Sequence, residues 1–225
     1  MEENDSDFVL KMEGAAIHEL PDHEYAVILQ TSRGRNQCFF HPTPQIRGAV
    51  IWAGGALGGV MGPAGGLYAD LADALVKENV SSLRLDYRQP GVFPECVLDV
   101  LAGVSFLKGL GATGLALVGH SFGGAVVIKA GELNPHVQAV AALSSQTNGA
   151  QDVARLAPRA LLLVHGTDDS HLPPNASQWI YDRALEPKEL VFYQGAGHRL
   201  HECRDELFAL LKGWLVERVG DKKPS

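Results

Sequence analysis

The sequence predicts one α/β domain, built on a mostly parallel sheet of about eight strands with an antiparallel N-terminal edge and helices on both faces. From Gly48 onward, short apolar runs alternate with helical segments, and this alternation builds a parallel sheet covered by helices. Before Pro42, extended segments are separated by turn residues, which favours an antiparallel meander. The length of 225 residues suits one hydrophobic core, so we expect a single domain over residues 1–225.

The N-terminal part is expected to hold three strands, at residues 8–12 (FVLKM), 25–30 (YAVILQ) and 38–41 (CFFH). A turn at residues 32–36 separates the second strand from the third, since serine, glycine and asparagine favour turns. Residues 1–7 and 220–225 are expected to be frayed, because chain ends that carry few apolar residues are poorly held.

The remainder is expected to repeat an apolar strand followed by a helical segment. The strands are expected at residues 49–52, 82–86, 115–119, 140–143, 161–165 and 190–193. The helices are expected at residues 67–78, 97–107, 123–133, 176–185 and 202–219, with a shorter one near 151–156. These strands are continuously apolar, as strands buried on both faces should be. The first helix carries Leu67, Leu71 and Leu75 at helical spacing.

Composition limits the classes of partner and the cellular location. A net charge of -7 argues against nucleic acid and against an anionic membrane, since both reward basic surfaces. No apolar run reaches the roughly 20 residues that a membrane helix needs, and the acidic N-terminus lacks the apolar core of a secretory signal. The three cysteines are odd in number and far apart, as is typical of reduced thiols. We expect a cytoplasmic monomer or weak homodimer that acts on a small molecule.

The segment 115–126 (LALVGHSFGGAV) carries the strongest functional signal in the chain. An apolar run ends at Gly119, and a helix-compatible segment of small residues starts directly after Ser121. A serine at the tip of such a strand-turn-helix needs neighbours without bulk at two positions before and two after, and Gly119 and Gly123 provide this. The pattern is G-x-S-x-G, and it predicts that Ser121 is a nucleophile.

A serine nucleophile needs a neighbouring imidazole as base and a carboxylate that orients the imidazole. In open parallel sheets these groups gather at the carboxyl ends of strands. Asp168 and Asp169 follow one of the later strands, and His198 follows the next one. The residues alone leave the choice of aspartate open, because adjacent acids in a turn are usually both solvated.

These motifs together resemble the α/β-hydrolase superfamily, in which the order along the chain is serine, acid, histidine. The segment HGTDDSHLP resembles the family's HGTxDxxVP segment, and this resemblance implies that Asp169 is the acid of a triad with Ser121 and His198. Only a short helix fits between the strands that end at residue 143 and begin at 161, so the resemblance implies a core without a lid domain.

The resemblance also implies an oxyanion hole and a substrate class. One donor is the backbone N–H of Phe122, and the other comes from the loop after the strand at residues 49–52. We place that donor at Gly55, with Ala56 and Leu57 as its rivals. The dienelactone-hydrolase-like branch fits the lidless layout, but its lactonase uses cysteine where this chain has Ser121, which favours a simple ester or thioester. From loop position, the substrate pocket is expected to include Leu57, Met61, Val92, Phe93, Leu172 and Arg199.

Three alternatives compete with a serine esterase. A hydrolase-like receptor or scaffold would keep the triad and bind a ligand without turnover, since a fold does not determine function. An amidase or peptidase would use the same triad. The H-x-x-H pattern of His198 and His201 also allows a metal site, but zinc needs three or four converging ligands, and the triad explains His198 more simply. We therefore expect no metal and no cofactor.

Overall fold

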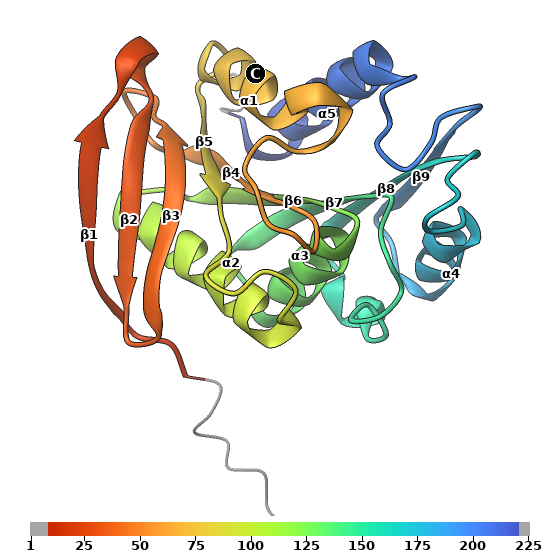
Figure 1. Ribbon diagram of the computed structural model, residues 1–225, viewed down its shortest axis with the longest axis horizontal. Coiled ribbons are helices and arrows are strands. Elements are labelled where there is room, and N and C mark those ends of the chain that lie inside the picture. The colour runs from red at the N-terminus through yellow and green to blue at the C-terminus, as the bar shows by residue number, and fades with distance from the viewer. Residues whose placement is uncertain (1–8, 221–225) are drawn as a thin grey trace, which may run out of the picture.

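The computed structural model describes residues 9–220, which form one sheet of nine strands in the order β1-β2-β3-β5-β4-β6-β7-β8-β9 (Figure 1). The expectations for residues 1–7 and 221–225 lie outside the described part of the chain. Gly220 is described, and its N–H donates to the carbonyl of Val216 (2.9 Å). No helix between residues 9 and 220 is long and apolar enough to cross a membrane.

The N-terminal edge of the sheet is antiparallel, as expected, but its first strand was misplaced. The three strands are β1 (Met12–Glu19), β2 (Tyr25–Thr31) and β3 (Gly34–His41), and a short 3-10 turn, η2 (Pro21–His23), precedes β2. The expectation of a strand over residues 8–12 is wrong, because residues 9–11 are not in a strand. Strand β1 instead pairs with the whole length of β2, and this pairing outweighs the weak strand preference of Gly14, Ala15 and Ala16.

The second part of the chain forms the parallel region and its helices. The strands are β4 (Gly48–Ala53), β5 (Val80–Leu85), β6 (Gly114–His120), β7 (Val137–Leu143), β8 (Ala160–Gly166) and β9 (Lys188–Tyr193). The helices are α1 (Pro63–Val76), α2 (Phe93–Gly109), α3 (Phe122–Leu133), η3 (Val153–Leu156), α4 (Asn175–Arg183) and α5 (Arg204–Val219). Each lies within a few residues of its expected position.

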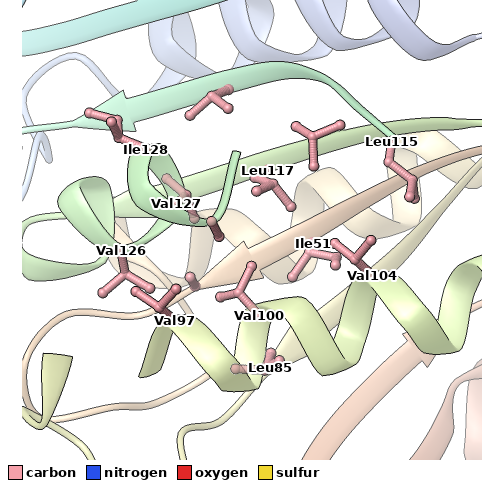
Figure 2. Packing of buried hydrophobic residues seen from close by; sticks show 14 of the residues in the cluster. Ile51, Leu85, Val97, Val100, Val104, Leu115, Leu117, Val126, Val127 and Ile128 are labelled. Atoms are coloured by element: carbon pink, nitrogen blue, oxygen red, sulfur yellow. The ribbon is translucent and has the colours of Figure 1, made fainter. Parts of the chain in front are cut away.

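Helices cover both faces of the sheet. Figure 1 shows α1 and α5 on one face, and α2, α3 and α4 on the other. Each face has its own core cluster of buried side chains. In the cluster under α2 and α3, Val100 and Val127 from the helices lie against Ile51 and Leu117 from the strands (Figure 2). Burial on both faces explains why these strands are continuously apolar in sequence.

The register of the sheet brings the candidate site together. Ala53 at the end of β4 pairs with Gly119 near the end of β6, so the loop after β4 lies beside the turn after β6. Gly166 at the end of β8 pairs with Tyr193 at the end of β9, so the loops that hold Asp169 and His198 are also adjacent. All four loops leave from the carboxyl ends of parallel strands, where ligands bind in sheets of this kind.

Candidate active site

Ser121 occupies a strained turn between β6 and α3. Its backbone has φ 59° and ψ -120°, a conformation with positive φ that is rare for residues other than glycine and that persists only where surrounding structure enforces it. The flanking glycines make this turn possible. A Cβ atom on Gly119 would lie 2.1 Å from the carbonyl oxygen of Gly123, and one on Gly123 would lie 2.1 Å from that of Gly54. Only glycine fits at these two positions.

Three side chains from distant parts of the sequence meet at this turn. Nε2 of His198 lies 3.0 Å from Oγ of Ser121, and Nδ1 of His198 lies 2.7 Å from Oδ2 of Asp169. The hydroxyl can therefore donate to Nε2 while Nδ1–H donates to the carboxylate. The side chain of Asp169 is fully buried and that of His198 is 18% exposed, and the imidazole of His198 contacts Ser121 and lines the cavity.

Asp169 has donors on both of its oxygens. Oδ1 accepts from the backbone N–H groups of His171 (2.8 Å) and Leu172 (2.9 Å), and Oδ2 accepts from His198 and from His165 Nε2 (3.1 Å). Burial acts to raise the pKa of Asp169, but the hydrogen bonds from Leu172, His198 and His171 outweigh it and hold the pKa below its usual value. Asp169 is therefore ionised at neutral pH.

Asp168, the rival aspartate, is not part of this hydrogen-bonded group. It is exposed, its carboxylate accepts from the hydroxyl of Thr167 (3.0 Å), and its backbone N–H donates to the carbonyl of Ala196 (2.9 Å). Its side chain has no hydrogen bond to His198. Of the two adjacent aspartates, Asp169 is the one that contacts the imidazole.

Two further imidazoles flank the ring of His198, and no local pattern in the sequence indicates their positions. The ring of His171 stacks on His198 with centroids 5.2 Å apart and an interplanar angle of 25°. On another side, the ring of His120 lies 4.9 Å away at 49°, and its Nε2–H donates to the carbonyl oxygen of His198 (2.9 Å). Burial lowers the pKa of His120 to about 4, so His120 is neutral at neutral pH.

A fourth histidine, His165, lies behind the carboxylate. It is fully buried, and its Nδ1 accepts from the hydroxyl of Ser177 (2.7 Å). Its Nε2–H is shared between Asp169 and the carbonyl oxygen of Leu172 (2.9 Å). Burial lowers the pKa of His165, so the ring is neutral, and these partners require the tautomer with the proton on Nε2.

A cavity of about 750 Å³ opens above Ser121. Its lining comes from the glycine-rich chain 54–66 and from His120, Ser121, His171, His198, Arg199 and His201. Three of the expected pocket residues, Leu57, Met61 and Arg199, line this cavity.

The other three expected pocket residues, Val92, Phe93 and Leu172, are not among the residues that line this cavity. Val92 is the residue before α2 and is exposed to solvent. The ring of Phe93 packs edge-to-face on Phe122, with centroids 5.8 Å apart. The backbone N–H of Leu172 donates to Asp169, and its carbonyl oxygen accepts from His165.

Gly55 lies beside Ser121. A Cβ atom at Gly55 would be 3.9 Å from the Cβ atom of Ser121. The carbonyl oxygen of Gly55 accepts from the N–H of Gly58 (3.0 Å), and these two residues form an isolated antiparallel bridge. Phe122, the other expected donor, is the first residue of α3.

The loop that carries Gly55 is held by the loop after β5. Oδ1 of Asp86 accepts from the N–H of Gly59 (2.8 Å), and the hydroxyl of Tyr87 donates to the carbonyl oxygen of Gly54 (3.2 Å). A Cβ atom on Gly58 would lie 2.8 Å from the same Asp86 oxygen. The turn at 54–59 is therefore packed tightly against its neighbour.

Solved structures share this architecture. Dienelactone hydrolase from Anabaena variabilis is 16% identical, with a TM-score of 0.75 over 87% of this chain and 98% of that one. An α/β serine hydrolase without a lid from Xanthomonas campestris is 21% identical, with a TM-score of 0.73 over 92% and 100%. An α/β serine hydrolase homologue from Coxiella burnetii is 19% identical, with a TM-score of 0.70 over 91% and 98%. No protein-family model and no curated protein matches the sequence. The chain has the α/β-hydrolase fold.

This α/β-hydrolase fold has no lid domain between β7 and β8. The connection, residues 144–159, contains only the four-residue helix η3. The cavity above Ser121 is consequently open to solvent. Among the described residues 9–220, no three histidine, cysteine, aspartate or glutamate side chains are grouped so that they could hold a metal ion.

Proposed function

We propose that this chain is a serine hydrolase that cleaves a small to medium carboxylic ester or thioester through an acyl-enzyme. The observation that carries the proposal is the continuous hydrogen-bonded row in which His198 lies 3.0 Å from Oγ of Ser121 and 2.7 Å from the ionised Asp169. An imidazole held in this way accepts the serine proton and is stabilised as a cation by the carboxylate.

In the acylation step, Oγ of Ser121 bonds to the substrate carbonyl carbon while its proton passes to Nε2 of His198. The carbonyl oxygen gains negative charge and accepts from the backbone N–H groups of Phe122 and Gly55. When the tetrahedral intermediate collapses, the bond to the alcohol or thiol breaks and His198 gives its proton to that leaving group.

In the deacylation step, a water molecule takes the place of the leaving group. His198 accepts one proton from this water, and the resulting hydroxide bonds to the acyl carbon. The bond from that carbon to Oγ then breaks, and the proton returns to Ser121. The open cavity supports this step, because water reaches the acyl carbon without movement of a lid. No step requires a cofactor.

We also propose a cellular compartment, a class of substrate and an oligomeric state. Cys38, Cys96 and Cys203 are buried free thiols, which supports a reducing compartment such as the cytoplasm. The names of similar structures, a dienelactone hydrolase and serine hydrolases, support a small-molecule ester as the substrate. We keep the proposal of a monomer or weak homodimer that binds neither nucleic acid nor membrane.

The experiment treats the protein with a fluorophosphonate probe and with a short-chain p-nitrophenyl ester. Ser121→Ala is the test variant, and Ser170→Ala, which changes an exposed serine in the loop after β8, is the matched control. We expect labelling and ester turnover in the wild type and in Ser170→Ala, and neither in Ser121→Ala. Labelling without turnover over a broad ester panel would support the receptor, and preferential cleavage of p-nitroanilides would support an amidase.

A further inference from the structure

The glycine-rich chain 54–66 that lines the cavity carries two exposed apolar side chains. Leu57 is 97% exposed and Met61 is 53% exposed, and both line the cavity above Ser121. We call these two side chains the apolar lip. A leucine left almost entirely in water gains nothing from burial, so its contact with the cavity is the feature that needs an explanation.

The turn that carries Leu57 cannot withdraw it into the core. The N–H of Gly58 donates to Gly55 (3.0 Å), and the N–H of Gly59 donates to Asp86 (2.8 Å). A Cβ atom on Gly58 would lie 3.2 Å from Pro90, so the turn is already in contact with the neighbouring loop. Leu57 is thus held out beside the cavity.

Met61 is held in a similar way. Its sulfur accepts from Nη1 of the buried Arg84 (3.5 Å), and a Cβ atom on Gly66 would lie 3.2 Å from its terminal methyl group. Between the two apolar side chains, Gly59 has open space where a Cβ atom would point. Gly58 and Gly59 therefore present backbone without side chains beside Leu57, and Val60 lines the cavity before Met61.

The lip is continuous with the place where the substrate carbonyl would bind. Leu57 follows Gly55 by two residues, a span of at most about 7 Å, and Gly55 lies against Ser121. The cavity is also lined by the polar side chains of His171, Arg199 and His201. An apolar group attached to the bound carbonyl can reach Leu57 directly.

We propose that the apolar lip binds an extended apolar chain of the ester, so that the preferred substrates carry several methylene groups beyond the reacting carbonyl. This inference rests on the proposed function and names the substrate class of the same site. Each methylene that leaves water on the lip contributes about fourfold to kcat/KM.

The test measures kcat/KM for p-nitrophenyl esters from acetate to octanoate. The variants are Leu57→Ser and Met61→Ser, and the control is Leu185→Ser, which changes an exposed leucine outside the cavity lining. We expect kcat/KM to rise about fourfold per methylene in the wild type and the control. The gain per methylene falls toward onefold in the lip variants. A parallel series of alkyl acetates shows whether the acyl or the alcohol chain lies on the lip.

Two results would overturn the proposal. One is a flat dependence on chain length in both ester series, and the other is an undiminished chain-length gain in Leu57→Ser and Met61→Ser. Failure of the hydrolase proposal is recognised separately, as loss of all turnover and labelling. Calorimetric binding of methyl ketones that carry the same alkyl chains then tests the lip directly. Equal affinity in the wild type and both lip variants would reject the proposed role of the lip.

Discussion

Nε2 of His165 lies 3.1 Å from Oδ2 of Asp169, the same oxygen that accepts from His198 at 2.7 Å. One carboxylate oxygen therefore serves two imidazoles, one facing the nucleophile and one buried behind it. Because Ser177 donates to Nδ1 of His165, the buried ring keeps its proton on the nitrogen that faces the acid. His165 acts on the reaction only through the position and charge of Asp169.

We expect His165→Phe to lower kcat by about tenfold to a hundredfold, comparable to the loss of outer-shell partners in other sites, with a small change in KM. The free energy of unfolding should fall by about 1–3 kcal/mol, because polar partners are left unpaired in the interior. His165→Gln can still donate to Asp169 and should recover part of kcat. Equal kcat in the two variants would contradict this role.

The two adjacent aspartates should differ sharply on substitution. Asp169→Asn should reduce kcat/KM by about 10⁴, as loss of the triad carboxylate does in serine proteases, because the amide cannot stabilise the imidazolium. Asp168→Asn should leave kcat/KM within about threefold, since surface changes away from the site have small effects. Steady-state kinetics on a p-nitrophenyl ester decides, and equal losses would show that the acid has been assigned wrongly.

Periodicity in the sequence was enough to predict the parallel region, because strands buried on both faces must be apolar throughout. It failed at β1. Gly14, Ala15 and Ala16 have little intrinsic preference for a strand, and their state is decided by pairing with β2, which no local pattern reveals. The strand positions around 49–52 and 161–165, by contrast, were placed within one or two residues of β4 and β8.

The candidate site also contains some residues that a local pattern predicts and others that it does not. Ser121 lies in a local motif with a steric reason for each glycine, so its turn could be predicted from five letters. His171 and His165 could not, because their roles arise from contacts with His198 and Asp169 that exist only in the folded chain. Val92 and Phe93 lie outside the lining of the cavity, because the distance along the chain from a strand end does not give the direction of a side chain.

The stacking of His171 on His198 leads to a prediction about catalysis in an open site. His171→Ala should lower kcat and the rate of fluorophosphonate labelling by about tenfold, because the base loses the ring that holds its orientation. KM and thermal stability should change little, since His171 is exposed. His171→Phe keeps a flat ring and should restore most of kcat.

The control for this prediction is His136→Ala. His136 is also exposed, and its backbone N–H bonds to the side chain two residues earlier (Asn134, 3.0 Å), as that of His171 bonds to Asp169. A loss in His136→Ala equal to that in His171→Ala would assign the effect to the loop backbone. A failure of His171→Phe to recover activity would reject the stacking role.

His120 should make the protein less stable as the pH is lowered from neutral. Burial lowers its pKa to about 4 in the folded protein, whereas an unfolded histidine titrates near 6.5. Between these values the unfolded chain binds more protons, so the folded state loses stability as the pH falls through this window, by a total on the order of 3 kcal/mol. His120→Gln removes this titration and can keep a donor toward the carbonyl of His198. Urea unfolding of both proteins at pH values from about 7.5 to 4.5 should therefore show a smaller acid loss in the variant, and parallel losses would mean that His120 is not held neutral by burial.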